Sequence, residues 1–289
     1  MTASSLAQVI VAGIAMGAIY TLMALGFTIL FNAMGVINFA QGDILMLGAV
    51  FGYTAYVQWH LDFFLTFVVG ALGAAAVGLL MNWLIFRPLL GHPPLNSVIA
   101  TIGASILIRA VGLIVWGSQA LYFPPVMGSQ PLNIFGVSIL PYYLWALVIA
   151  LLCIAGMQAF FRYTRTGKAM RATAQSRDAA ALQGIPVHRM DALASAISAG
   201  LSGIGGVLVA PIFFVQTSMG ALAGLKGFAA AVFGGLGSIP GAILGGIGLG
   251  VAENLSATLI SSTYRDAVAF VILLAILFWR PSGLLGRSK

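Results

Sequence analysis

The stretch "LAQVIVAGIAMGAIYTLMALGFTILF", residues 6–31, decides the fold class, because it has no charged side chain and exceeds the roughly 20 apolar residues that a helix needs to cross a bilayer. Runs 63–86 and 141–161 share this character, and a run at 266–279 is marginal in length. Only 7% of the chain is charged and 61% is hydrophobic, whereas about 25% of a soluble domain is charged. The sequence therefore predicts an α-helical protein that crosses a membrane several times.

We expect one transmembrane domain over residues 1–289, with an all-α fold of eight or nine membrane-spanning helices and glycine-rich breaks. The glycine-rich segment 221–238 is predicted either to cross as a short ninth span or to re-enter the membrane. Glycines four residues apart, such as Gly13/Gly17 and Gly246/Gly250, predict faces on which helices approach closely. The other candidate spans are 6–31, 36–58, 63–86, 97–117, 141–161, 192–215, 241–260 and 266–279.

Lys and Arg are unevenly distributed along the chain. Ten of the thirteen are Arg87, the six between Arg162 and Arg189, and the three from Arg280 to the C-terminus, whereas loop 118–140 has none. Because basic loops remain on the cytoplasmic side, we expect 162–191 and the C-terminus to face the cytoplasm of a bacterial cell, with the chain in its inner membrane.

The sequence offers little for enzymatic or metal chemistry. It lacks the G-x-x-x-x-G-K-[ST] phosphate loop, so ATP, if used, must bind to another chain. Its three histidines, His60, His92 and His188, are far apart and lack metal-ligand spacing. We therefore expect no catalytic residues, no metal and no cofactor in this chain.

Two segments hold candidates for a translocation pathway. In "GVINFAQGDILMLGA" (35–49), Asn38 and Gln41 resemble a capping box, which predicts a helix from Phe39 and places Asn38 near the cytoplasmic boundary. Asp43 then lies inside the span, and either supports the positive helix end or lines the pathway.

The second segment is "GLGSIPGAILGG" (235–246), where Pro240 suits the first turn of a helix capped by Ser238 or Ile239. Glu253 in that helix is either near the far interface or in the pathway. Of the remaining charges, Arg109 lies within a span, where it has either a structural role, which we favour, or a role in transport. Lys226, Arg265 and Asp266 are predicted at span ends, where charge is tolerated.

Segment 168–184 is the polar exception to this apolar chain. No Pro or Gly interrupts Lys168 to Gln183, which predicts one short helix, and Gly184 followed by Pro186 ends it. Its polar stripe is Lys168, Arg171, Gln175 and Asp178, beside a small-residue face of Ala169, Ala172, Thr173, Ser176 and Ala180. Such a helix either lies solvated at the surface or docks onto a soluble protein.

Several stretches together resemble the LivH-type branched-chain amino acid permeases of ATP-binding-cassette (ABC) importers. "DAAALQG" (178–184) is similar to the E-A-A-x-x-x-G loop of ABC importer permeases, with Asp178 in the Glu position and without the I-x-L-P element that usually follows. The other stretches are "GAIYTLMALGFTILFNAMGVINFAQGDILMLGA" (17–49), "RPLLGHPPLNSVIATIGASILIR" (87–109), "TRTGKAMRATAQSRDAAALQGI" (164–185) and "GLKGFAAAVFGGLGSIPGAILGG" (224–246).

The resemblance implies a permease that pairs with a homologous permease, two cytoplasmic ATPases and a periplasmic binding protein. It also implies that 168–184 contacts the ATPase, which gives the coupling residues Arg171, Gln175, Asp178, Ala179, Ala180 and Gly184. The candidate pathway residues are Asn38, Gln41, Asp43, Ser238, Pro240 and Glu253. Two alternatives remain open: a permease for urea, short amides or other small carboxylates, or an ion-coupled secondary transporter.

Overall fold

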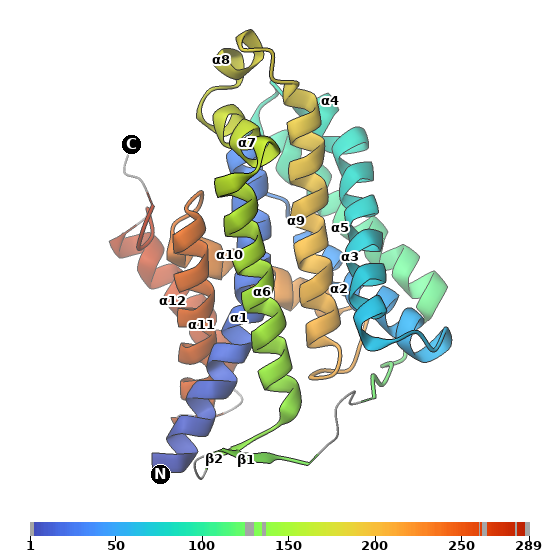
Figure 1. Cartoon of the computed structure of the whole chain (residues 1–289), viewed down its shortest axis with the longest axis vertical. Helices are drawn as coiled ribbons and strands as arrows, with labels where there is room; N and C mark the ends of the chain where they lie inside the picture. The colour runs from blue at the N-terminus through green and yellow to red at the C-terminus, as the bar shows by residue number, and fades with distance from the viewer. Residues whose placement is uncertain are drawn as a thin grey trace.

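Helix α1 (Ala3–Met34) runs through most of the molecule, from the end that holds the N-terminus to the level of α7, below α8 (Figure 1). The computed structural model describes residues 3–124, 130–134, 137–259, 261, 265–280 and 282–286. Within these ranges the chain is mostly helical, as predicted. The exception to the helices and their loops is an antiparallel pair of short strands, β1 (Leu132–Ile134) and β2 (Val137–Ile139), at the N-terminal end.

The other helices follow in chain order, and two of them continue into π-helical turns, η1 (Thr54–Gln58) and η2 (Asn82–Phe86). They are α2 (Gln41–Tyr53), α3 (Phe63–Met81), α4 (Arg87–Leu89), α5 (Pro94–Trp116), α6 (Pro141–Tyr163), α7 (Arg165–Gln175), α8 (Arg177–Leu182), α9 (Val187–Val209), α10 (Met219–Gly234), α11 (Ile239–Leu259) and α12 (Arg265–Trp279).

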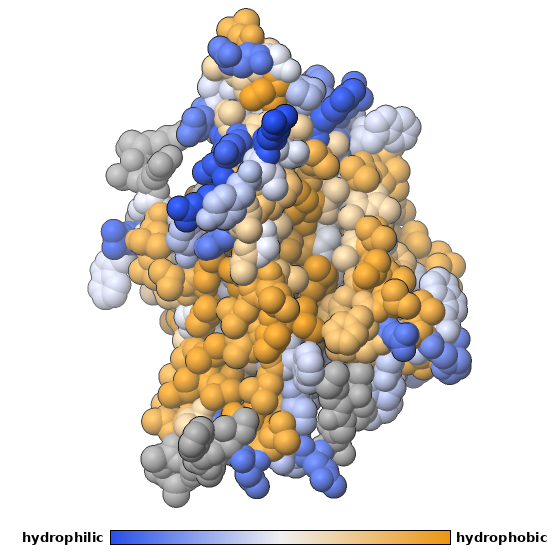
Figure 2. All heavy atoms as spheres, viewed as in Figure 1, coloured by the Kyte–Doolittle hydropathy of each residue, from blue (hydrophilic) through white to orange (hydrophobic). Residues whose placement is uncertain are grey.

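Six helices of the described chain are long and apolar enough to cross a membrane. They are Ser5–Met34, Phe63–Leu89, Pro94–Trp116, Pro141–Tyr163, Val187–Val209 and Ile239–Leu259. The predicted count of eight or nine spans is not confirmed, because α2, α10 and α12 are shorter helices of 13, 16 and 15 residues. Figure 2 shows a broad apolar band between two ends where polar side chains gather.

The centre of the bundle is formed by α1, α2, α9 and α11, and glycine allows their close approach. A Cβ atom at Gly17 would lie 2.6 Å from the Cα of Ile247, and one at Gly13 would lie 2.9 Å from the Cα of Val251. The backbones of α1 and α11 therefore touch, as the four-residue glycine spacing predicts.

The outer helices α3, α5 and α6 expose large apolar side chains, such as Leu72 (65%), Ile114 (84%) and Leu152 (66%). Hydrocarbon side chains at this exposure suit lipid, since no water lies in the bilayer core. Helix α5 packs mainly on α2 and η2, so most of its surface is left for lipid or for another protein.

Candidate translocation and coupling sites

The chain re-enters the bundle after α1, through a non-helical segment at residues 35–40. The helix that follows begins at Gln41 rather than at the predicted Phe39. Gln41 is fully buried, and its Nε2 donates hydrogen bonds to the carbonyl of Ser198 (3.1 Å), the Oγ of Ser198 (3.0 Å) and the Oγ of Ser202 (2.6 Å). Since Ser198 is in the middle of α9, α2 begins deep inside the bundle.

The predicted position of Asn38 near the cytoplasmic boundary is therefore wrong. Asn38 is 2% exposed, its Oδ1 accepts a hydrogen bond from the N–H of Ala40 (3.0 Å), and its Nδ2 donates to the Oε1 of Gln41 (3.1 Å). The two polar side chains pair as the sequence suggested, but they stabilise a buried helix start. Spacing along the chain gave no sign that the non-helical segment carries this helix start into the interior.

The first turns of α2 and α10 meet next to this point. A Cβ atom at Gly42 would lie 2.6 Å from the Cα of Gly224, and one at Gly220 would lie 2.8 Å from the Oδ1 of Asp43. Each helix N-terminus carries a partial positive charge, so two positive ends converge beside one carboxylate. The sequence identified α10 as ambiguous, and the structure shows why: it starts inside the bundle.

Asp43 forms an ion pair with Arg109 of α5. The carboxylate is 1% exposed and its Oδ1 lies 2.7 Å from the Nε of Arg109, while the Arg109 Nη2 donates to Oδ2 (3.3 Å) and to the Oγ of Ser105 (3.0 Å). The Arg109 side chain is 37% exposed. The sequence placed both charges in spans but did not predict that they pair.

A second ionic cluster is enclosed by α10, α11 and α12. The Nζ of Lys226 lies 2.6 Å from the Oε1 of Glu253 and 2.6 Å from the Oδ1 of Asp266, and the Nε of Arg265 lies 2.9 Å from the same Oε1. Glu253 is fully buried, and within the described residues its Oε2 has no hydrogen-bond partner. Lys226 was expected at the end of a span, where charge is tolerated. This prediction is wrong, because Lys226 is buried and paired with Glu253.

Ser238 and Pro240 lie away from both ionic sites. The Oγ of Ser238 accepts a hydrogen bond from the N–H of Gly241 (3.1 Å), and Pro240 lies in the first turn of α11, which confirms the predicted cap. Asn32 near the end of α1 donates to the carbonyl of Gly237 (2.9 Å). This break is therefore at the α7–α8 end of the bundle, a helix length away from Glu253.

The predicted single helix over Lys168–Gln183 is wrong, because the chain forms two helices, α7 and α8. Ser176 between them has an extended backbone (φ −157°, ψ 114°), and its side chain accepts a hydrogen bond from the N–H of Ala179. The Ser176 side chain thus caps α8, and this cap competes with continuation of α7. The predicted stop is confirmed at Gly184, whose φ of +77° suits glycine.

Of the predicted small-residue face, Thr173 and Ala180 are directed into the chain, Ala169 and Ala172 are half-buried, and Ser176 is exposed. Thr173 is 1% exposed and Ala180 is 4% exposed, whereas Leu182 is 88% exposed. Asp178 and Ala179 of the same helix are also exposed, and so are Arg171, Gln175 and Gly184. A partner protein would therefore meet the Leu182 side of α8 and not the face with Ala180.

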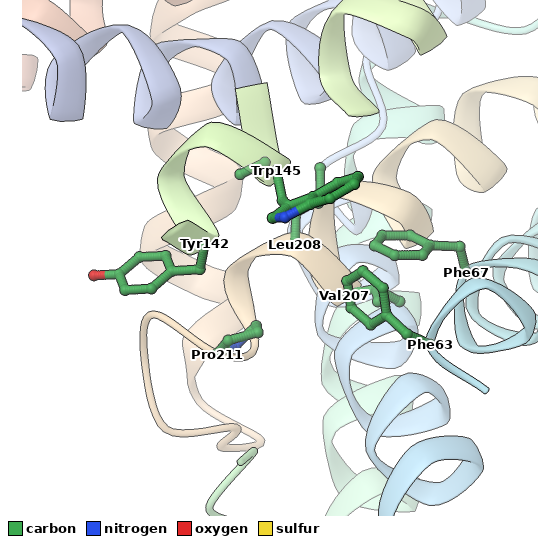
Figure 3. Close-up of a pocket in the computed structure, with 8 residues that line it drawn as sticks. Phe63, Phe67, Tyr142, Trp145, Val207, Leu208 and Pro211 are labelled. Atoms are coloured by element: carbon green, nitrogen blue, oxygen red, sulfur yellow. The ribbon is translucent and has the colours of Figure 1, made fainter. Parts of the chain in front are cut away.

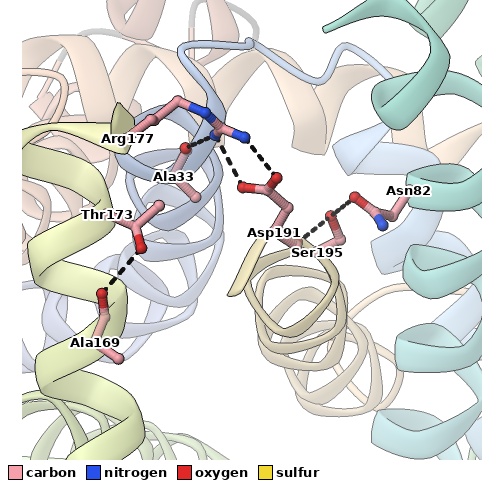
Figure 4. Close-up of polar contacts among 7 residues, drawn as sticks. All are labelled: Ala33, Asn82, Ala169, Thr173, Arg177, Asp191 and Ser195. Atoms are coloured by element: carbon pink, nitrogen blue, oxygen red, sulfur yellow. Dashed lines mark hydrogen bonds and ion pairs between the residues drawn. The ribbon is translucent and has the colours of Figure 1, made fainter. Parts of the chain in front are cut away.

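Arg177 fixes α8 to two central helices (Figure 4). Its Nη1 donates to the carbonyl of Ala33 at the end of α1 (2.6 Å), and both terminal nitrogens donate to the carboxylate of Asp191 in α9 (2.9 and 2.7 Å). A cation is favourable at a helix C-terminus, and a bidentate carboxylate contact fixes the orientation of the guanidinium. The sequence did not predict this pair, because its members are 14 positions apart and lie in different helices, α8 and α9.

A small apolar cavity lies between α3, α6 and α9 (Figure 3). Aromatic rings dominate its lining, and the labelled residues are Phe63, Phe67, Tyr142, Trp145, Val207, Leu208 and Pro211. Its volume of about 30 Å³ is room for little more than a water molecule. Trp and Tyr are common where helices leave the membrane, so this cavity fits an interfacial aromatic belt better than a substrate site.

A family model described as "Branched-chain amino acid transport system / permease component" matches residues 9–277. The chain belongs to this family. It is 33% identical over 290 residues to the "High-affinity branched-chain amino acid transport system permease protein LivH" of Salmonella typhimurium, covering 96% of this chain and 94% of that protein. It is 34% identical over 297 residues to the corresponding permease protein BraD of Pseudomonas aeruginosa, covering 98% and 96%. Together with the six apolar helices, membership of this permease family makes the chain an integral membrane protein.

The fold is also similar to a chain in the structure of PsaBC from Streptococcus pneumoniae in complex with Fab. The TM-score is 0.54 at 16% sequence identity, and the match covers 94% of this chain and 91% of that chain. At this identity the likeness concerns the arrangement of helices alone.

Proposed function

We propose that this chain is the transmembrane permease subunit of an ABC importer that carries branched-chain or other hydrophobic amino acids across the bacterial inner membrane. The observation that supports this function is the family match over residues 9–277, together with permease relatives that align over nearly the whole chain. Its partners are a homologous permease, two cytoplasmic ATPases and a periplasmic binding protein. ATP hydrolysis takes place in the ATPases, and this chain needs no cofactor.

In this proposal, α8 is the element that the ATPase contacts. Leu182 offers an exposed apolar anchor, and Asp178 and Ala179 surround it with a small polar surface. Arg171 and Gln175 extend this surface along α7. Ala180 and Gly184 act indirectly, since one packs α8 onto the bundle and the other ends it.

Arg177 then connects ATPase movement to the membrane part of the chain. It binds the end of α1 and the start of α9, and the re-entrant segment begins directly after α1. A displacement of α8 therefore acts on the segment that holds Asn38, Gln41 and Asp43. We assign these three residues and Glu253 to the translocation pathway, with Ser238 and Pro240 shaping its cytoplasmic end.

The orientation follows from charge. Six basic residues lie between Arg162 and Arg189, which favours a cytoplasmic position for α7, α8 and the C-terminus. The strands β1 and β2 are at the opposite end and would face the periplasmic binding protein.

The test is uptake of labelled leucine into proteoliposomes that contain both permeases and both ATPases, with the binding protein added. We expect uptake that requires ATP and the binding protein, and that isoleucine and valine compete for. Uptake driven by an ion gradient without ATP would replace this function with secondary transport. ATP-driven uptake of urea or a short amide, without leucine uptake, would keep the mechanism and change the substrate.

A further inference from the structure

Arg109 is a partly exposed arginine on an otherwise apolar helix face. Its neighbours on the same face of α5, Ile102, Ile106 and Leu113, are 45%, 64% and 46% exposed, and Arg109 itself is 37% exposed. Because these exposed neighbours are apolar, Arg109 is not exposed by lying in a water-facing segment. The Arg109 side chain is thus an isolated polar group on the surface of a membrane span.

The side chain points toward the middle of that span rather than toward its nearer end. Arg109 precedes the helix end at Trp116 by about two turns. Its Nη2 bonds to the Oγ of Ser105, one turn further from that end. The guanidinium therefore lies about three turns, or roughly 16 Å, inside the end of α5, near half the thickness of a hydrocarbon core of about 30 Å.

Lipid is a poor neighbour for this group. Long cationic side chains near a helix end normally extend to the interface, and Arg109 does the opposite. Ionisable residues inside membranes typically face a bundle interior or a water-filled cavity. The exposed side of Arg109 consequently borders a polar space that the chain does not close by itself.

The opposite side of the pair has the features of a binding site for a carboxylate or an ammonium group. Asp43 is buried at the point where the N-termini of α2 and α10 converge, and Gly42 and Gly220 allow the two backbones to touch beside it. One cationic fork, one carboxylate and two positive helix ends thus lie within a few ångströms of each other.

We propose that Asp43 and Arg109 receive the zwitterionic head group of the transported amino acid midway across the membrane. Arg109 binds the α-carboxylate in its bidentate fork, and Asp43 binds the α-ammonium group. This inference rests on the proposed function for its substrate class. No covalent bond is made or broken in this exchange. The internal ion pair is replaced by two ion pairs with the substrate, and the net charge of the site stays at zero.

The experiment replaces both charges at once, in the complete complex with its binding protein. The variant Asp43→Asn/Arg109→Gln keeps side-chain size and avoids an orphaned buried charge. We expect leucine uptake at saturating binding protein to fall at least tenfold, while ATP hydrolysis stimulated by the loaded binding protein stays within twofold of the unmodified complex.

A matched control loosens the same pair of helices elsewhere. The indole Nε1 of Trp116 donates to the Oγ1 of Thr54 (2.9 Å), which also joins α5 to the α2–η1 helix. Thr54→Val removes that bond and leaves Asp43 and Arg109 intact, so uptake should be retained. Equal loss of uptake in Thr54→Val and the double variant would assign the effect to helix packing and overturn the proposal.

Accessibility gives a second measurement that needs no change to the pair. In a Cys153→Ala background, Ile106→Cys should react with a membrane-impermeant thiol reagent, because it lies one turn from Arg109 on the proposed aqueous face. Leu152→Cys on α6, which replaces a residue of similar exposure (66% against 64% for Ile106), should not react. An unreactive Ile106→Cys would overturn the proposal even if the double variant failed to assemble.

The outcomes separate this inference from the proposed function. If the unmodified complex shows no ATP-driven amino acid uptake, the proposed function fails. If it transports leucine and Asp43→Asn/Arg109→Gln transports within twofold of it, only the head-group site fails. Joint loss of uptake and of stimulated ATP hydrolysis in an assembled double variant would make the pair structural.

Discussion

Two arginine–aspartate pairs in this chain have the same chemistry and nearly the same burial, but they lie in different surroundings. In the Asp43–Arg109 pair the arginine is 37% exposed and the aspartate 1%, and in the Asp191–Arg177 pair the values are 35% and 2%. Arg177 is at the polar end of the molecule, where water solvates its exposed atoms. Arg109 lies among apolar side chains of a span, so the same exposure requires a polar neighbour.

The comparison teaches that burial does not by itself separate an anchor from a binding site. Arg177 makes three hydrogen bonds within the chain, to a helix C-terminus and a carboxylate, and Arg109 also makes three. Lys226 is similarly enclosed, between Glu253 and Asp266. Arg109 differs from both, because its partly exposed side chain lies among exposed apolar side chains of a span.

The largest expected effect comes from removing one member of each pair. Arg109→Ala leaves Asp43 buried and unpaired, which should cost about 3 kcal/mol or more of stability. Arg177→Ala also leaves a buried carboxylate, Asp191, but at the polar end of the molecule water can enter the vacated space, so the expected cost is smaller, about 1 to 2 kcal/mol. The thermal unfolding midpoint of the purified complex in detergent measures the difference. A lower midpoint for Arg177→Ala than for Arg109→Ala would contradict the water-facing position of Arg177 and the membrane position of Arg109.

The next effect concerns α8, the helix that carries Arg177. Leu182→Asp places a charge at the exposed apolar anchor of α8 and should reduce co-purification of the ATPases about tenfold, or ~1.4 kcal/mol. Ser176→Asp is the control, because it adds the same charge to the same loop and aspartate also caps helices. If both variants retained their ATPases, α8 would be a solvated loop.

A smaller effect should follow from neutralising the Asp191–Arg177 pair. Arg177→Gln/Asp191→Asn keeps the packing but weakens the link from α8 to α1 and α9. We expect the ATPases to remain bound, and leucine transported per ATP hydrolysed to fall about three- to fivefold, near 1 kcal/mol of coupling. An unchanged ratio would mean that this pair only stabilises the fold.

The smallest effect tests the direction in which Arg109 points. Ser105→Ala removes one hydrogen bond to Nη2, worth about 1 kcal/mol at most, while the pair with Asp43 remains. Leucine uptake should fall less than threefold, and the unfolding midpoint should hardly move. A loss as large as that of Arg109→Ala would show that the position of the guanidinium depends on Ser105 rather than on Asp43.

Local chemistry predicted much of this structure. Charge-free runs predicted the long helices, glycine spacing predicted faces of close helix approach without their partners, and Ser238 with Pro240 predicted the start of α11. These features depend on neighbours in the sequence, and their physical causes lie within a few residues.

The sites were harder to predict, because their partners are distant in the chain. Gln41 binds Ser198, Asp43 binds Arg109 and Lys226 binds Glu253, and no spacing rule joins such positions. Ala180 shows the same limit, since the direction of a small-residue face depends on what the helix packs against. The break at Ser176 depended on a cap that competed with helix propensity.

One measurement tests most directly the claim that α8 is the ATPase end of an importer. Single cysteines are placed at Leu182 and, as the opposite-end control, at Asn133 in β1, both in a Cys153→Ala background of the assembled complex. A thiol cross-linker should join Leu182→Cys to an ATPase subunit, and Asn133→Cys should react only with an impermeant reagent added from the periplasmic side. Labelling of Leu182→Cys from the periplasm, or cross-linking of Asn133→Cys to the ATPase, would contradict the account.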